Sequence, residues 1–333
     1  MKIPPEYAIS DEMLLLISRI EAERLHFSSL NLEFQIKENI QRVSLLKSSL
    51  FSARIEGNLL KISDFEFGKE TEEEKKKEIF NIADAINFMD KNVKKSITKD
   101  LLLRLHALVL KNISSDSGYL RTEISSIFNQ AGVAVYMPPP PTQISKLLED
   151  LLVYVNSGKE KFPLIVAFVA HLIFEKIHPF LDGNGRVGRL LVSAVLKSKD
   201  WDFTFSVPFE EYLDEHKDEY YFYLDQGLKN TNDYLEFMLG AFYKQIERVK
   251  TQINEELSKE KHPFLPPRQE EILNIIKDHM VVSFDMIRRR FLQVPKRTLR
   301  YDLKKLSDKK LIEKSGETRG RYYRVSRATE PKV

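Results

Sequence analysis

The stretch His178-Pro-Phe-Leu-Asp-Gly-Asn-Gly-Arg-Val-Gly-Arg189 decides how the rest of the sequence is interpreted. It joins an apolar segment to a second segment of helical periodicity through a turn that contains two glycines and an asparagine. The second helix would begin in this turn, so its first backbone N–H groups and the positive end of its dipole would be free. Gly183 and Gly185 let a ligand approach that backbone closely. This arrangement is typical of phosphate-binding sites.

Four side chains of the same stretch add chemistry to the turn. Arg186 and Arg189 are three residues apart, so they share one side of the helix start and can both reach phosphate oxygens. Asp182 offers a hard oxygen ligand suited to a magnesium ion that bridges phosphates. His178 has the residue type and pKa range to take a proton from a hydroxyl. Each feature alone is compatible with packing or a solvated surface, but together they predict phosphoryl or nucleotidyl transfer.

Helical periodicity dominates the first 260 residues, and strand-like alternation is nearly absent. The expected helices cover residues 9–25, 28–55, 77–92, 98–111, 143–156 (behind a threonine cap), 163–177, 184–198, 209–228 and 232–258. Residues 118–141 break the pattern and close on four prolines, which favours a short hairpin or loop. Beyond a proline cluster at residues 263–267 we expect helices at 268–278, 283–291 and 296–308, then strands near 311–315 and 321–325. Three helices followed by a two-stranded wing is the winged-helix order.

The composition is that of an ordinary soluble globular protein, with 42% hydrophobic and 30% charged residues among 333. The absence of cysteine excludes disulfides, thiolate metal sites and a cysteine nucleophile. No secretory signal is visible, and the longest apolar stretch, Phe162 to Phe174, has only thirteen residues, so we expect a cytoplasmic protein without a membrane partner. Residues 261–333 carry a net charge of +10, which leaves about −7 for residues 1–260 of a chain whose total is +3.

The central stretch resembles the Fic (filamentation induced by cyclic AMP) family, whose signature is His-Pro-Phe-x-Asp/Glu-Gly-Asn-Gly-Arg-x-x-Arg. All nine fixed positions are present. The resemblance also includes Gly118-Tyr-Leu-Arg121, Ala170-His171 and Tyr220-Tyr221, so it spans roughly residues 40–245. It implies a protein adenylyltransferase, an enzyme that transfers AMP from ATP to a Ser, Thr or Tyr hydroxyl of a target protein.

The resemblance also assigns roles to individual residues. His178 would deprotonate the target hydroxyl, and Asp182 would bind Mg²⁺. The nucleotide would be held by Gly183, Asn184 and Gly185 at the α- and β-phosphates, by Arg186 and Arg189 at the β- and γ-phosphates, and by Tyr220 and Tyr221 at the base, although packing in the core is an equal alternative for the two tyrosines. Val135, Tyr136 and Met137 would form a flap that aligns the target as an added strand.

A second segment, Ser52-Ala-Arg-Ile-Glu56-Gly57, ends a helix that stops at glycine. A carboxylate in a last helical turn opposes the helix dipole, which indicates a partner elsewhere. The segment resembles the Ser/Thr-x-x-x-Glu-Gly/Asn inhibitory helix of many Fic proteins, here around residues 45–57 and N-terminal to the core. By this resemblance Glu56 pairs with Arg189 and denies that arginine to the γ-phosphate. Automodification, and removal of AMP supported by the same glutamate, are further activities that the resemblance allows.

The C-terminal helix at 296–308 resembles the recognition helix of winged-helix DNA-binding domains. Leu299, Leu303 and Leu306 form its core-facing stripe. The cationic residues Lys296, Arg297, Arg300 and Lys304 of the helix, with Arg319 and Arg321 of the wing, would contact DNA phosphates. Protein contact or dimerisation is the alternative use of such a module.

We therefore expect a mainly α protein: a Fic-type helical bundle with a short β-hairpin flap, plus a C-terminal winged helix-turn-helix domain. Its expected parts are an N-terminal helical region (1–95), the Fic catalytic core (96–260) and the winged helix (261–333). The expected activity is auto-inhibited, Mg²⁺-dependent AMP transfer from ATP to a protein hydroxyl. The alternatives are removal of AMP, transfer of another nucleotidyl or phospho-group at the same site, or a nucleotide-sensing DNA-binding regulator without turnover. The expected partners are ATP, a target protein, DNA and a second copy of the chain.

Overall fold

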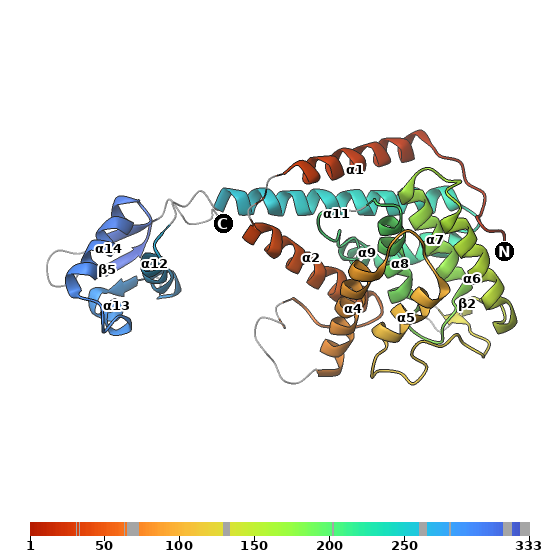
Figure 1. Ribbon diagram of the computed structural model, residues 1–333, viewed down its shortest axis with the longest axis horizontal. Coiled ribbons are helices and arrows are strands. Elements are labelled where there is room, and N and C mark those ends of the chain that lie inside the picture. Colours follow the sequence, from red (N-terminus) through yellow and green to blue (C-terminus); the bar gives the residue numbers. More distant parts are fainter. Residues whose placement is uncertain are drawn as a thin grey trace. The chain divides into compact units, whose positions relative to one another are not determined.

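The protein is represented by a computed structural model that describes residues 1–30, 32, 34–62, 64, 73–128, 134–201, 203–259, 265–279, 281–315 and 322–326 (Figure 1). The chain divides into two compact units, Met1–Asn254 and Glu255–Val333. Each unit has its own apolar core. Among the described residues, none of the helices combines the length and the apolar character that a membrane crossing requires.

The first unit is built from helices and one small hairpin. Its helices are α1 (Asp11–Ser29), α2 (Phe34–Ile55), α4 (Glu73–Asn92), α5 (Lys99–Val109), α6 (Pro141–Asn156), α7 (Pro163–Ile177), α8 (Asn184–Ser198), α9 (Glu210–Glu215), α10 (Lys217–Gln226) and α11 (Thr231–Lys259). The hairpin pairs β1 (Ile127–Phe128) with β2 (Ala134–Tyr136) in antiparallel orientation. The prediction of a mainly helical fold is confirmed.

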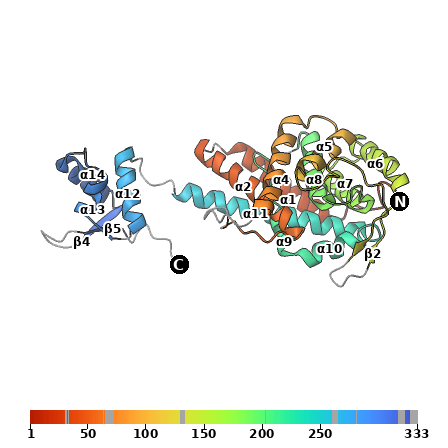
Figure 2. The same ribbon diagram turned by 90° about the horizontal axis from the view of Figure 1, so that it is seen from below.

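Helix α7 is the centre of this unit because its sequence is apolar on every side. All residues from Leu164 to Ile177 are buried, including His171, Glu175 and Lys176. It packs along α8 and against α6, while α5, α2 and α4 contact α8. Figure 2 shows α7 and α8 between α5 and α6 on one side and α11 on the other. The connection between the two central helices is therefore held by the core of the protein.

Three local expectations were wrong. The single helix expected over 209–228 is interrupted at His216, which leaves helical geometry (φ −116°, ψ 40°) and stacks its ring on Tyr212 with centroids 3.9 Å apart. The threonine cap expected before residue 143 is absent because α6 begins at Pro141, whose fixed φ suits a first helical position. The helix expected to start at 28 begins at Phe34.

The second unit contains α12 (Pro267–His279), α13 (Phe284–Arg290) and α14 (Lys296–Asp308) with a three-stranded antiparallel sheet. The strands are β3 (Val281–Ser283), β4 (Ile312–Ser315) and β5 (Tyr322–Val325), in the order β3-β5-β4. The sequence did not predict β3, because its pairing partner, β5, lies some forty residues further along the chain. The assignment of this unit as a winged helix stays a prediction.

Candidate active site

The connection between α7 and α8 is a loop with two left-handed residues. His178 caps α7 at φ 50°, and its N–H donates to the Phe174 carbonyl at 2.9 Å. Gly183 precedes α8 at φ 80°, a conformation that favours glycine. The Asn184 side chain closes the loop, since its Oδ1 accepts from the Phe180 N–H at 2.9 Å and its Nδ2 donates to the Phe180 carbonyl at 2.8 Å. The side chain of Asn184 is thus fully used within the loop, and of this residue only the backbone N–H remains to contact a phosphate.

His106 of α5 supports the loop through hydrogen bonds and ring stacking, a role that the sequence did not indicate. Its Nδ1 accepts from the Gly118 N–H at 2.9 Å, so the proton is on Nε2, which lies 3.0 Å from the Asp182 carbonyl oxygen. The ring also stacks on Phe180, with centroids 3.7 Å apart and planes 3° from parallel. His106 thus fixes the backbone on which Asp182 and Gly183 sit.

His178 is largely buried at the end of α7, and burial lowers its pKa to about 4, with the Arg121 charge adding to the effect. A histidine of ordinary pKa, about 6.5, is partly protonated at neutral pH. His178 is instead neutral at that pH. It is therefore in the form that can accept a proton.

This lowered pKa predicts how the reaction depends on pH. For a base of pKa about 4, the rate of any transfer that uses His178 should change less than about twofold between pH 5.5 and pH 7. A base of pKa about 6.5 would be roughly nine-tenths protonated at pH 5.5 and would slow the reaction about tenfold there. A pH profile of kcat/KM, which reports the pKa values of the free enzyme, checks this. A tenfold fall at pH 5.5 would contradict it.

Arg121 joins the loop to the flap. It is buried, and its Nε donates to the His178 carbonyl at 2.7 Å, while Nη1 donates to the Glu123 carbonyl at 2.8 Å and Nη2 to the Pro139 carbonyl at 2.5 Å. The Arg121 N–H donates to the Pro179 carbonyl at 3.0 Å. One guanidinium thus ties both ends of the flap segment to the residue that would act as base.

Replacing Arg121 with methionine should lower the free energy of unfolding by about 2–5 kcal/mol, because hydrogen bonds from a charged donor contribute about 1.5–3 kcal/mol each and several carbonyls would lose theirs. The matched control is Arg104→Met, in which an exposed arginine over the Phe88 ring is lost and about 1 kcal/mol or less is expected. Chemical denaturation measures both. Equal losses in the two variants would show that the Arg121 contacts do not stabilise the protein.

The flap residues lie within the segment whose two ends Arg121 holds. The Tyr136 hydroxyl donates to the Lys176 carbonyl at 2.9 Å, and the Lys176 ammonium lies 4.4 Å from the Tyr136 ring centre. Met137 is exposed. The backbone of Val135 is in β2, but its side chain is outside the description. The structure thus gives contacts for Tyr136 and an exposed surface at Met137.

Arg189 is held by the end of α2. Its Nη2 donates to Glu56 Oε1 at 2.9 Å and to the Ser52 carbonyl at 2.8 Å, and its Nε donates to Ser52 Oγ at 3.0 Å. Its side chain is 1% exposed. A Cβ at Gly185 would collide with the same Glu56 carboxylate, so Glu56 lies against the first turn of α8. The expected contact between Glu56 and Arg189 is therefore present. Gly57 follows at φ 105°, where it ends the helix.

Arg186 is held by two other carboxylates. Its Nη1 lies 2.5 Å from Glu78 Oε1, and its Nη2 lies 2.7 Å from Asp182 Oδ1. Glu78, on α4, did not stand out in the sequence, because it follows three glutamates and three lysines in a charged run typical of a solvated helix face.

Tyr220 and Tyr221 differ in their surroundings. Tyr220 is 1% exposed, and its hydroxyl lies 3.1 Å from His171 Nε2, whose Nδ1 lies 2.6 Å from the Tyr234 hydroxyl. Tyr221 is 40% exposed and donates to the Ile55 carbonyl at 3.2 Å. These placements favour a core role for Tyr220 and leave Tyr221 as the tyrosine able to touch a ligand.

The donor set at Asp182 fits a magnesium ion held mainly by phosphates. No group of three or more His, Asp or Glu that could hold a metal ion exists among the residues that the structure describes. Mg²⁺ typically binds proteins through one or two carboxylates and takes its other ligands from phosphates and water. The Asp182 side chain is 61% exposed at the start of α8, so it can supply such a carboxylate.

The model of the Fic/DOC family matches residues 96–196, which include the whole stretch from His178 to Arg189. The chain carries a Fic domain.

Relatives of this Fic domain are protein adenylyltransferases by name. A probable protein adenylyltransferase of Aquifex aeolicus (strain VF5) is 29% identical over 147 residues, which are 41% of this chain and 43% of that protein. A protein adenylyltransferase Fic of Drosophila ananassae is 34% identical over 106 residues, 31% of this chain and 20% of that protein. The matched stretches thus span less than half of these relatives.

Two solved structures share the fold. A Fic family protein from Desulfovibrio desulfuricans G20 has a TM-score of 0.74 at 22% identity and covers 98% of this chain and 99% of its own. Fic-1 from C. elegans has a TM-score of 0.60 at 20% identity and covers 72% of each chain. At these identities the likeness concerns the fold alone.

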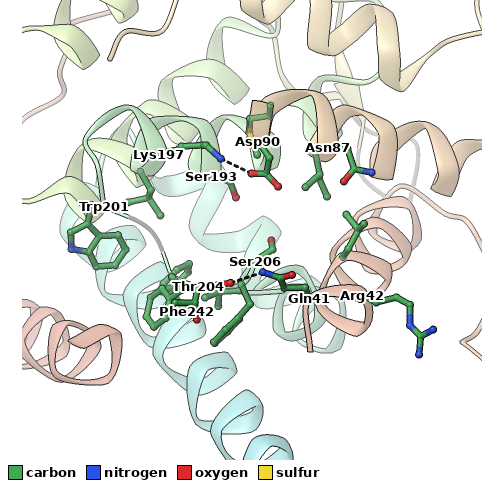
Figure 3. A pocket seen from close by; sticks show the side chains of 17 residues that line it. Gln41, Arg42, Asn87, Asp90, Ser193, Lys197, Trp201, Thr204, Ser206 and Phe242 are labelled. Carbon is green, nitrogen blue, oxygen red and sulfur yellow. Dashed lines mark hydrogen bonds and ion pairs between the residues drawn. The ribbon is translucent and has the colours of Figure 1, made fainter. Parts of the chain in front are cut away.

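The first half of α2 and the second half of α8, both away from the motif segments, line a separate cavity. A cavity of about 470 Å³ lies between α2, α4, α8, α11 and residues 201–207, with the Lys197–Asp90 ion pair at its edge (Figure 3). It is lined by Gln41 and Leu45 from the first half of α2 and by Ser193 and Leu196 from the second half of α8, and by no residue of the His178–Arg189 motif. The cavity is therefore separate from the His178–Arg189 loop.

The four predicted DNA-contacting residues of α14 lie on one helix face. Lys296, Arg297, Arg300 and Lys304 are exposed on α14, while Leu299, Leu303 and Leu306 are buried. Arg319 and Arg321 fall outside the described residues. DNA binding and dimerisation stay predictions.

Proposed function

We propose that the protein is an auto-inhibited adenylyltransferase that moves AMP from ATP to a hydroxyl of a target protein. The observation that carries the proposal is a neutral histidine, His178, placed in the loop that leads into the N-terminus of α8, with two buried arginines on the first turns of that helix. The adenylyltransferase names of the relatives support the same reaction.

The chemistry follows from the positions of these groups. The backbone N–H groups of the first turn of α8 and the positive end of its dipole would bind the phosphates. Arg186 and Arg189 would add charge-assisted hydrogen bonds to phosphate oxygens. Asp182 would hold Mg²⁺, which offsets phosphate charge when bound.

The transfer itself needs a base and a leaving group. The target hydroxyl gives its proton to the neutral ring of His178 while its oxygen bonds to the α-phosphorus. The bond from the α-phosphorus to the bridging oxygen breaks, and pyrophosphate leaves with the electron pair. The β- and γ-phosphates, held by the two arginines, are therefore the part of ATP whose charge increases in the reaction.

The resting arrangement opposes this reaction. The Glu56 carboxylate occupies the first turn of α8, where a phosphate would bind, and it pairs with Arg189. An acidic side chain is favoured at a helix N-terminus for the same reason that a phosphate is. Glu56 would thus act as an internal competitor of the nucleotide.

Labelled ATP tests the reaction type. The protein is incubated with Mg²⁺ and ATP that carries its label at the α-phosphate or, in parallel, at the γ-phosphate. We expect the α-label on protein and the γ-label in pyrophosphate. The γ-label on protein would show phosphoryl transfer instead. No label on protein in the Glu56→Gly variant either, despite nucleotide binding, would favour the nucleotide-sensing regulator.

A further inference from the structure

The guanidinium of Arg186 is held by carboxylates at both terminal nitrogens, whereas its Nε is buried and has no hydrogen-bond partner among the residues that the structure describes. Both of its terminal nitrogens face carboxylates, Nη1 at Glu78 Oε1 (2.5 Å) and Nη2 at Asp182 Oδ1 (2.7 Å). The side chain is 6% exposed, so it is removed from solvent in this arrangement. Before Arg186 can offer its two-pronged donor set to a phosphate, at least one of these pairs has to open.

Glu78 is in turn tied to the inhibitory segment. Its second oxygen, Oε2, accepts from Asn58 Nδ2 at 2.8 Å, and Asn58 directly follows Gly57. The same Nδ2 donates to the Lys75 carbonyl at 3.0 Å, and Asn58 Oδ1 accepts from the Leu60 N–H at 3.1 Å. Asn58 is buried. The end of α2, which carries Glu56, is thus linked through Asn58 and Glu78 to Arg186.

The two motif arginines therefore have matching partners: Glu56, which directly follows α2, for Arg189, and Glu78 from α4 for Arg186. With Asp182 included, three carboxylates face two guanidinium groups, a net charge of −1 where a triphosphate has to bind. Such a site repels an anion although it contains both arginines.

We propose that Glu78 is a second inhibitory carboxylate, which neutralises Arg186 as Glu56 neutralises Arg189, and that Asn58 connects the two. The inference rests on the proposed function, because it concerns regulation of the same nucleotide site. In this arrangement the nucleotide has to displace two carboxylates, and a movement at the end of α2 reaches both arginines.

If Glu78 had a positioning role instead, its loss would change the nucleotide affinity in the opposite direction. If Glu78 only oriented Arg186 toward the nucleotide, its loss would leave the arginine misplaced and would weaken nucleotide binding. If Glu78 neutralises Arg186, its loss strengthens binding. The sign of the change in nucleotide affinity therefore separates the two roles.

The experiment compares Glu78→Gln with wild type by calorimetric titration with α,β-methylene-ATP, an analogue that cannot release AMP, at fixed Mg²⁺. Glutamine keeps the size of the side chain and removes its charge. We expect a Kd about tenfold lower, the effect of one unit charge roughly 10 Å from the phosphates at an effective dielectric constant of about 20. The matched control is Glu74→Gln, which removes an exposed charge one turn earlier on α4 and should change the Kd less than twofold.

A second variant protects the test against a folding defect. Glu78→Asp keeps the charge but shortens the reach to Arg186, and we expect a Kd between those of wild type and Glu78→Gln. A Kd that is unchanged or higher in Glu78→Gln, or changed equally by Glu74→Gln, would overturn the inference.

Transfer of α-labelled AMP, measured beside the titrations, separates this inference from the proposed function. Tighter binding in Glu78→Gln with no transfer by any variant, Glu56→Gly included, would remove the proposed activity but retain the inhibition of nucleotide binding by Glu78. Transfer by Glu56→Gly with unchanged binding in Glu78→Gln would retain the activity and overturn the inference alone.

Discussion

Replacing Glu56 with glycine is expected to raise the rate of AMP transfer about 10- to 100-fold. The variant frees the first turn of α8 and releases Arg189 from its carboxylate, so that the arginine can bind the γ-phosphate. A hydrogen bond from a charged group contributes about 1.5–3 kcal/mol, and each 1.4 kcal/mol is about tenfold in rate. Label from α-labelled ATP, followed on protein over time, measures the effect.

The freed arginine would not be left without partners. Its bonds to Ser52 Oγ and to the Ser52 carbonyl remain. We therefore expect Glu56→Gly to fold, with stability reduced by less than the about 3–5 kcal/mol typical of a one-sided break of a fully buried pair.

Glu56→Gln is the matched control for the charge. Glutamine still occupies the space beside Gly185 but does not neutralise Arg189, so we expect a rise smaller than that of glycine. Equal rates of AMP transfer by wild type and Glu56→Gly would show that Glu56 does not inhibit the reaction.

The site was predictable from the sequence where its parts are close along the chain. His178, Asp182, Arg186 and Arg189 belong to one loop and one helical turn, so local geometry brings them together in any helix–turn–helix connection. The pairing of Glu56 with Arg189 spans 133 positions, and only resemblance to a family indicated it.

The supporting contacts were not predictable, because they depend on packing between distant helices. His106 sits in an apolar helix and has the signature of a core histidine, yet its two nitrogens fix Gly118 and Asp182. Glu78 looks like a solvated charge until α4 packs beside α8. In the fold, no sequence signal indicated the break at His216, where the ring stacks on Tyr212.

The motif alone also does not show whether its arginines are free or paired with other side chains. In the sequence, His178, Asp182 and the two arginines predict a site that is open to a nucleotide. In the structure each arginine is paired with a carboxylate from a distant part of the chain. Helices α2 and α4 lie outside the stretch matched by the Fic family model, so the proposed regulation would be encoded apart from the proposed chemistry.

Replacing His178 with alanine is expected to lower AMP transfer about 10²- to 10⁴-fold, the usual contribution of a positioned general base. Nucleotide binding should change little, because the phosphate contacts come from α8. The experiment uses the Glu56→Gly background, in which the protein with His178 intact is expected to be active enough for such a loss to be measured.

The backbone at His178 requires a second variant. Its φ of 50° is left-handed, a conformation that alanine tolerates less well than asparagine does. His178→Asn therefore removes the base with little added strain, and we expect it to be as inactive as His178→Ala while unfolding at a temperature closer to that of the parent. If His178→Asn retained activity while His178→Ala lost it, the histidine would serve the loop conformation and another group would take the proton. If both variants are inactive and both still bind α,β-methylene-ATP, the loss is assigned to the imidazole itself.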